Sequence, residues 1–383
     1  MDINISEGKR LYMMFSAILL SLLLFSQAFM VQSAEVDSFT QRNQPLADAL
    51  TLVNHITQQR FVEAVDRANR ISRNVAMHRR PPKSTHKIYS MQKSVDYCNA
   101  DHLYDTLREE FGGAFVGHFE EDLTDSPIVP KRLIPREQSI YQDFLFKEAP
   151  TLIAANRISP VLNMANIFIG TDKFGHFFEE GWVYFEKAYI AEESLSDAIF
   201  FGFLTESMGY GAVTTGVFSY ADLVANLNGM RFWNRVLAEN PDILTGQKIR
   251  PYIACMHRTW QIQTVFDWYD YIDLAWDEAN NCVKLRNEQL LLKVKNRLSL
   301  LDKNNNAVSS CLIGKVNWYD VKEKYGNYFP YLINLEGHVT LPDTLLPDAM
   351  LETYWNKIDG DHKKPEWIKK MYLRAIAYLK IWQ

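Results

Sequence analysis

The side chains best suited to chemistry lie in one stretch of the 383-residue chain, residues 170–233. An Asp-Lys-x-x-His run comes first, an isolated glutamate follows, and a Ser-x-x-Asp-x-x-x-Asn run comes last. Histidine and carboxylates at four-residue spacing on neighbouring helices can bind a divalent metal ion or work as an acid/base pair. We therefore expect a His/carboxylate site here, and a divalent metal ion is the cofactor that it would take.

The candidate site residues fall into overlapping groups by predicted role. The catalytic candidates are His176, Glu206 and Asp222. The candidate metal ligands are Asp172, His176 and Glu206, and the cofactor-binding candidates are Asp172, Lys173 and Asn226.

The first run predicts a helix that begins at Asp172, with Thr171 as its N-cap. At about 100° per residue, one face of this helix is polar and the opposite face is aromatic. The polar face carries Asp172, His176, Glu179 and Glu180. A solvated face is the simpler interpretation of this helix taken alone, because charge opposite an apolar stripe is typical of surface helices.

Glu206 is the only charged residue between positions 198 and 221, and its neighbours are mostly aromatic or aliphatic. Burying a carboxylate without a partner is costly, so Glu206 must be paired, hydrogen-bonded or protonated. The flanking helices supply the candidate partners that are nearest in sequence. We therefore predict that His176, Glu206 and Asp222 converge on one locus.

The pattern Ser219-x-x-Asp222 is a capping box with aspartate in place of the usual glutamate, and this alone accounts for both residues. It does not account for Asn226, which shares a helical stripe with Asp222, Gly229 and Trp233. A mid-helix glycine costs up to about 1 kcal/mol relative to alanine and usually marks the close approach of another element. This stripe is therefore expected to face protein.

At these residues the chain resembles the superfamily that contains VanZ-like proteins and YfiM-like predicted periplasmic proteins. The shared pattern is D-K-x-x-H-F, then an isolated Glu, then S-x-x-D-x-x-A-N-x-x-G, which correspond here to residues 172–177, Glu206 and residues 219–229. VanZ-like proteins are multi-pass membrane proteins, whereas this chain has no uninterrupted apolar span outside its N-terminus. YfiM-like proteins are shorter and include lipoproteins, and no cysteine precedes Cys98 here. The resemblance implies a bacterial envelope protein and supplies no established reaction.

The N-terminus has the features of an export signal. Two basic residues precede an apolar run at 11–25, and small residues follow before the acidic Glu35. Cleavage is expected after Ala28 or near Ala34, so residues 1–34 are predicted to be a signal peptide and the protein to be periplasmic or secreted. An uncleaved membrane anchor is the alternative, although the apolar run is shorter than the roughly 20 residues that a span prefers.

The four cysteines, Cys98, Cys255, Cys282 and Cys311, lack the paired C-x-x-C spacing of zinc or redox sites. In an oxidising compartment they can form two disulfides, and their spacing leaves all three connectivities open. Free thiols are the alternative.

Helical periodicity dominates the chain and predicts a mainly α fold. Helices are expected at residues 46–71, 101–119, 151–157, 194–214, 219–237, 260–279 and 287–300. The core is predicted to consist of three packed helices that begin near Asp172, Ser194 and Ser219, with Phe177, Phe185, Phe203, Leu204, Leu223 and Leu227 buried between them.

The predicted organisation is an N-terminal helical segment at 35–80, a helical core domain at 81–300 and a loop-rich, aromatic C-terminal extension at 301–383. Residues 79–84 are expected to be a solvated linker, and residues 365–382 a final helix. Segment 266–282 carries five acidic residues among aromatics. A solvated acidic face is the simpler interpretation of this segment, and a second cation-binding or substrate-binding surface is the alternative.

A formal net charge of -5 and a pI near 6.0 give no basic field for nucleic acid, so nucleic acid is excluded as an expected partner. The first functional hypothesis is an exported, metal-dependent hydrolase that acts on envelope lipid or cell-wall material. The rival is a non-enzymatic envelope protein, structural or interacting with partners, whose polar cluster locks the packing of its helices. Membrane association is expected only through an uncleaved N-terminus.

Overall fold

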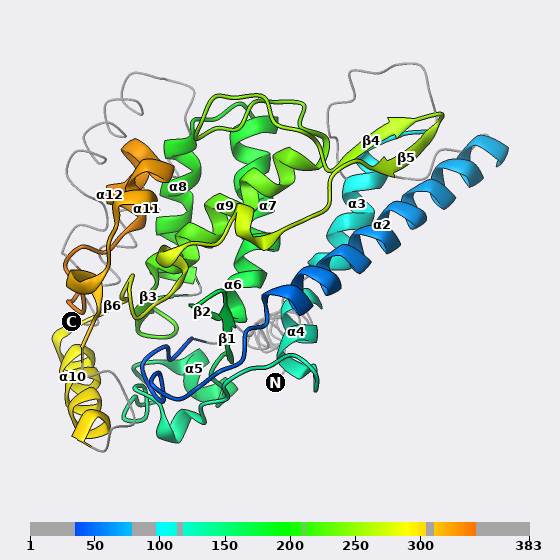
Figure 1. Cartoon of the computed structure of the whole chain (residues 1–383). Coiled ribbons are helices and arrows are strands. Elements are labelled where there is room, and N and C mark those ends of the chain that lie inside the picture. The colour runs from blue at the N-terminus through cyan, green and yellow to red at the C-terminus, as the bar shows by residue number, and fades with distance from the viewer. Residues whose placement is uncertain (1–34, 79–96, 113–117, 210, 304–309, 342–383) are drawn as a thin grey trace, which may run out of the picture.

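A computed structural model describes residues 35–78, 97–112, 118–209, 211–303 and 310–341, which form a mainly helical protein with three small antiparallel sheets (Figure 1). The mainly α prediction is confirmed. The predicted signal peptide, the linker at 79–84 and the final helix at 365–382 lie outside these residues. Within them, no helix is both long enough and apolar enough to cross a membrane.

Four helices precede the central segment of the described chain, and the longest of them is α2. They are α2 (Leu50–His78), α3 (Ala100–Phe111), α4 (His118–Asp125) and α5 (Pro150–Ala155), with the 3-10 turn η1 (Arg136–Gln138) before α5. The helix predicted at 101–119 ends at Phe111, where Gly112 is extended, and α4 is a separate helix.

The central segment begins with a short hairpin, in which β1 (Val161–Met164) pairs with β2 (Ile167–Gly170). A nearly continuous helix follows, and it alternates α-helical and π-helical turns. Its parts are α6 (Asp172–Gly175), the π turn η2 (His176–Glu180), α7 (Gly181–Phe185) and the π turn η3 (Glu186–Ile190). Next come α8 (Leu195–Leu204), the π turn η4 (Thr205–Gly209), β3 (Val217–Phe218) and α9 (Tyr220–Leu237).

Helices α7, α8 and α9 pack against one another (Figure 1). The six side chains predicted for their core are all buried. Two glycines allow the closest approach, because a Cβ atom at Gly229 would collide with the carbonyl of Phe177, and one at Gly181 would lie 2.6 Å from Gly229 Cα. The expectation that Gly229 marks a close helix contact is therefore confirmed.

The segment predicted as a helix at 260–279 is instead a strand followed by turns, so that prediction is wrong. The strand β5 (Thr259–Ile262) pairs with β4 (Ile253–Met256), and the 3-10 turns η5 (Trp268–Asp270) and η6 (Leu274–Trp276) follow. The carboxylates of Asp267 and Asp273 accept hydrogen bonds from the backbone N–H groups two residues further on, Tyr269 and Ala275. Such local bonds compete with helix formation, and periodicity alone does not reveal them.

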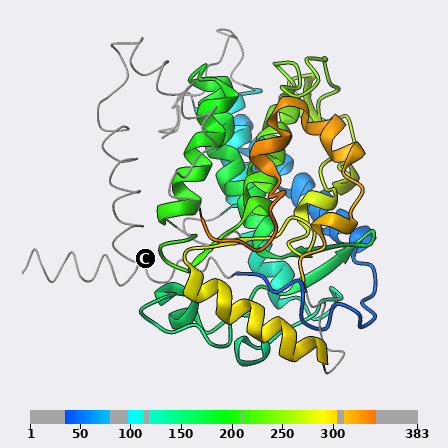
Figure 2. The same cartoon turned by 90° about the vertical axis from the view of Figure 1, so that its left-hand side faces the viewer.

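The remaining elements close the lower end and one side of the molecule. They are β6 (Lys284–Leu285), which pairs with β3, then α10 (Glu288–Lys303), η7 (Ile313–Lys315), α11 (Tyr319–Tyr325), η8 (Gly326–Tyr328) and α12 (Phe329–Leu332). Helix α10, in yellow, lies at the lower end in both views (Figures 1 and 2). It covers a second, smaller hydrophobic core together with α5.

Long-range contacts join the predicted domains. Arg42 forms an ion pair with Asp277, and the Asn334 N–H donates to Asn281 Oδ1 at 2.9 Å. Two disulfides, Cys98–Cys255 and Cys282–Cys311, select one of the three connectivities that the sequence left open. The second disulfide anchors the segment that follows Glu278.

Candidate metal centre

The hairpin β1–β2 leads directly into the site, because β2 ends at Gly170 and α6 begins at Asp172. The helix start and its N-cap residue, Thr171, agree with the prediction, but the Thr171 side chain does not cap the helix. The Thr171 hydroxyl accepts a hydrogen bond from the Thr124 hydroxyl at 2.9 Å and makes no side-chain cap bond. Lys173, in the first turn of α6, is completely buried.

Two π turns present His176 and Glu206. The carbonyl of His176 accepts from the N–H of Gly181, five residues on, and Glu206 is the second residue of the π turn η4 (Thr205–Gly209). A π turn widens the helix locally and is frequent at functional sites. It also changes the helical register, so the uniform rotation assumed for the predicted polar face does not hold beyond His176.

Glu206 finds its partner at the start of α9, where its Oε1 accepts from the N–H of Ser219 at 2.9 Å. The Ser219 hydroxyl in turn caps the helix by accepting from the N–H of Asp222. In a capping box the Asp222 carboxylate would bind the Ser219 N–H. Glu206 takes that place, and the Asp222 carboxylate instead accepts from the Ser219 hydroxyl at 3.0 Å and contacts Lys173 and His176.

The ammonium of Lys173 lies among three carboxylates, a group that we call the Lys173 cluster. Its Nζ contacts Asp172 Oδ2 at 2.7 Å, Glu278 Oε1 at 2.7 Å and Asp222 Oδ1. Burial alone would lower the pKa of Lys173, but Asp172, Asp222 and Glu278 outweigh it, so this pKa is raised. An ammonium has three N–H donors, and this one has three carboxylate acceptors.

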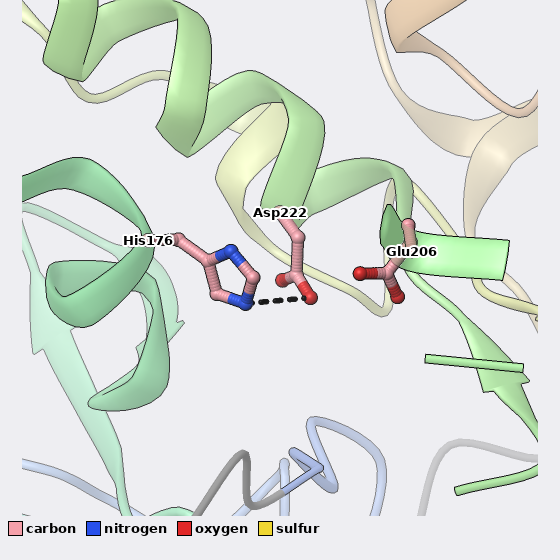
Figure 3. Close-up of side chains that lie close together, drawn as sticks. All are labelled: His176, Glu206 and Asp222. Atoms are coloured by element: carbon pink, nitrogen blue, oxygen red, sulfur yellow. Dashed lines mark ion pairs between the residues drawn. The ribbon is translucent and has the colours of Figure 1, made fainter. Parts of the chain in front are cut away.

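The other oxygen of Asp222 belongs to a second group, which we call the His176 triad. Its members are His176, Glu206 and Asp222. One ligand atom from each of these residues lies within 4.8 Å of those from the others. His176 Nε2 is 3.1 Å from Asp222 Oδ2. In Figure 3, His176 and Glu206 point from opposite sides toward Asp222. The predicted convergence of these three residues is therefore present.

The second ring nitrogen of His176 is also engaged. Nδ1 lies 3.1 Å from Asn226 Oδ1 and 3.7 Å from Glu180 Oε2. Since both neighbours are oxygens, Nδ1 carries a proton and acts as the donor. The arrangement directs Nε2 toward the triad.

Burial and charge shape the titration of the triad. Burial lowers the pKa of His176, but the Asp222 and Glu180 carboxylates outweigh burial and raise it. For Glu206, burial is the largest cause of a raised pKa, and Asp222 adds to it. Burial would also raise the pKa of Asp222, yet His176 and Lys173 lower it below its ordinary value.

The site carries more buried acid than base. The carboxylates Asp172, Glu206, Asp222 and Glu278 are at most 6% exposed, and Lys173 and His176 are the basic groups beside them. Glu35 adds to the imbalance, because burial together with Glu278, Glu206 and Asp222 raises its pKa. The centre must therefore hold protons or a further cation.

The structure separates the predicted site residues into the two groups. Asp172, predicted as a metal ligand beside His176 and Glu206, belongs to the Lys173 cluster, and Asn226 lies on the far side of the His176 ring. Asp172 is 6% exposed and the His176 side chain 11%, so the solvated-face interpretation of this helix is wrong.

Sequence reasoning missed Glu278, which is 1% exposed and belongs to the Lys173 cluster. The simpler interpretation of segment 266–282, a solvated acidic face, is wrong for Asp277 and Glu278, which are buried. Asp277 binds Arg42 and Asp273 binds Lys324, whereas Asp270 is exposed and pairs with Arg235. A further missed acid is Glu120, whose pKa is raised by burial and by Asp172.

Comparison of the chain with protein-family models, curated proteins and solved structures finds no match. The candidate site is therefore assigned from its geometry alone.

Proposed function

We propose that the chain is an exported bacterial envelope protein that binds one divalent cation at the His176 triad and hydrolyses envelope lipid or cell-wall material there. The observation that carries the proposal is the convergence of one imidazole nitrogen and two carboxylate groups within 4.8 Å. These ligand types are used by zinc and other first-row transition metals in proteins. Three protein ligands would leave positions for water and substrate, as in catalytic zinc sites.

Asn226 supports this role for His176. A metal-binding histidine usually donates its second ring N–H to an oxygen, which fixes the tautomer and the direction of the ring. Here Nδ1 faces Asn226 Oδ1 at 3.1 Å, so Nε2 is the nitrogen left for a cation. Cation binding would then displace the proton that the raised pKa of His176 keeps on the ring, and protons should be released on binding.

The charge imbalance favours a cation at the same position. Glu206 is a buried carboxylate whose Oε1 accepts a hydrogen bond from the Ser219 N–H. A divalent ion between Glu206 and Asp222 would offset the repulsion that raises the pKa of Glu206. Such an ion would act as a Lewis acid toward a bound ester, phosphoester or amide.

Export is supported by two features. The first 34 residues have the charged start, apolar run and small-residue end of a signal peptide. Both pairs of cysteines form disulfides, which is typical of oxidising compartments. Mass spectrometry of the envelope fraction should find a mature N-terminus between Phe29 and Glu35, and an intact Met1 in the cytoplasm would contradict export.

The rival function is a non-enzymatic envelope protein in which the polar residues only join helices. The Lys173 cluster favours it, since Lys173 joins α6 to α9 and to the Glu278 segment with its side chain 1% exposed. The two functions make different predictions for the His176 triad. The hydrolase requires a bound divalent ion there, whereas the packing role requires only the charged side chains.

Glu206→Gln separates them. Glutamine keeps an oxygen that can accept from the Ser219 N–H, but it removes the charge that a cation needs. We expect loss of divalent-ion binding and of chelator-sensitive hydrolysis of ester, phosphoester or envelope substrates, with little change in thermal stability. Glu148→Gln is the matched control, since Glu148 is 5% exposed and pairs with Lys293 outside the triad.

Unchanged ion binding in Glu206→Gln would contradict the proposed site. Ion binding by the wild type without hydrolysis of any substrate class would retain the site and favour the non-enzymatic function.

A further inference from the structure

Asp222 is shared by two groups of potential cation ligands. Its Oδ2 faces His176 Nε2, and its Oδ1 faces Lys173 Nζ. On the Oδ1 side, ligand oxygens of Asp172, Asp222 and Glu278 all lie within 4.8 Å of one another, as do the ligand atoms of the His176 triad. The carboxylate of Asp222 thus bridges two positions that each suit a cation.

One of these positions is filled by the chain itself. Lys173 Nζ contacts all three oxygens, and every N–H of the ammonium has a carboxylate acceptor. The lysine side chain is 1% exposed, so it has neither a free donor nor access to a substrate. Lys173 can therefore affect the site only by positioning the carboxylates that it binds.

Asp172 provides a second observation that points to a cation here. Its Oδ1 is buried and has no hydrogen-bond partner among the described residues, while its Oδ2 binds Lys173. Asp172 is 6% exposed, and only one of its two carboxylate oxygens binds Lys173, so the other oxygen is available as a cation ligand. A divalent ion accepts more oxygen ligands than an ammonium has protons.

We propose that Lys173 is a built-in cation that occupies the second position of a two-cation centre, with Asp222 as the bridging ligand. The inference rests on the proposed cation at the His176 triad. In two-metal hydrolytic sites the ions lie about 3.5–4 Å apart. Here the chain supplies the second charge permanently, so the centre works with one exchangeable ion, and Lys173 is a positioning residue that holds Oδ1 of Asp222 while Oδ2 faces His176.

The test counts ions in the full-length protein after chelator treatment. Equilibrium dialysis against Mn²⁺ should give one ion per chain for the wild type and two for Lys173→Ala, because removal of the side chain opens the carboxylate pocket. Electron paramagnetic resonance should show exchange coupling between two Mn²⁺ ions in the variant alone. A variant that gains no ion over the wild type overturns the inference.

Two comparisons keep the result interpretable. Lys187→Ala removes a lysine from a half-buried pair with Glu193 and should leave the count at one. Lys173→Ala/Glu278→Ala removes a ligand of the second position and should lose the extra ion. A wild type that binds no Mn²⁺ contradicts the proposed function, and the inference is still judged by the gain in Lys173→Ala.

If Lys173→Ala does not fold without metal, Lys173→Ala/Asp172→Asn provides the second variant. Asparagine keeps an oxygen ligand at position 172 and removes one of the unpaired charges. This variant should also gain one Mn²⁺ and be stabilised by it against heat. A folded double variant that binds one uncoupled ion would overturn the inference.

Discussion

Each of the two sides of Asp222 combines carboxylates with one basic side chain, but the two sides differ in burial and in the basic group that faces the carboxylates. On the Lys173 side, three carboxylates enclose an ammonium, and the side chains of Lys173 and Glu278 are 1% and 2% exposed. On the His176 side, two carboxylates face an imidazole, and the side chains of His176 and Glu180 are 11% and 22% exposed. The first side is closed and supplies its own cation, whereas the second retains contact with solvent. Burial of acids alone therefore does not identify a functional site. The distinguishing feature is whether the compensating cation comes from the chain, as on the Lys173 side, or from solvent, as we propose for the His176 side.

The largest effect is expected from Lys173→Met in metal-free buffer. Methionine fills most of the space but leaves Asp172, Asp222 and Glu278 without their cation. Removing one partner of a buried ion pair typically costs about 3–5 kcal/mol. Urea denaturation should show a loss of that size, and Lys187→Met should change the free energy of unfolding by no more than about 0.5 kcal/mol. A loss below about 1 kcal/mol for Lys173→Met would refute the structural role of the cluster.

The pH dependence of stability should come in part from Glu278. Burial, with Asp222 and Asp172, outweighs the attraction of Lys173 and raises the pKa of Glu278 from 4.5 to about 7. Because the folded protein holds this proton more tightly than the unfolded chain, the stabilisation is complete below pH 4.5 and is lost as the pH rises through 7. Glu278→Gln cannot lose a proton there.

The metal-free wild type should accordingly lose up to about 3 kcal/mol relative to Glu278→Gln between pH 4.5 and pH 8. Denaturant unfolding at several pH values measures this difference. Parallel stability curves for the two proteins would show that Glu278 titrates normally.

A smaller effect is expected on the open side from Asn226→Ala. Loss of the acceptor for His176 Nδ1 should weaken divalent-ion binding by about 10–100-fold, as for other groups that orient a metal-binding histidine. Asn228→Ala is the matched control on the same helix, because Asn228 bonds Tyr325 and Arg231. That control should lose stability and keep its ion affinity. Equal ion affinities in the two variants would remove Asn226 from the site.

The smallest effect is expected from Glu180→Gln. Glu180 Oε2 lies 3.7 Å from His176 Nδ1 and its side chain is 22% exposed, so solvent screens the pair. Ion affinity should change by about 1 kcal/mol or less, measured by calorimetric titration. A loss as large as that in Glu206→Gln would instead make Glu180 a ligand.

The sequence predicts the open side better than the closed side, for physical reasons. Glu206 is the lone charge in an apolar helix and so required a partner, and Asn226 followed Asp222 at helical spacing on a face that also carries Gly229. The partner proved to be the backbone N–H of Ser219. Because Glu206 holds the Ser219 N–H, the Asp222 carboxylate binds the Ser219 hydroxyl, Lys173 and His176 instead, which the capping pattern did not indicate.

The closed side depends on contacts between residues far apart in the chain. Glu278 follows Asp267, Asp270 and Asp273, whose spacing imitates one face of a helix although two of them bind local backbone N–H groups. Lys173 and Glu278 are separated by about a hundred positions in the sequence, and no local pattern links them.

Anomalous diffraction from crystals soaked in Zn²⁺ tests the central claim most directly, because it locates an ion without reference to activity. A single strong peak within bonding distance of His176 Nε2, Glu206 and Asp222 Oδ2, about 2.0–2.2 Å away, is the predicted result. A soaked crystal with no peak at these three residues would contradict the account.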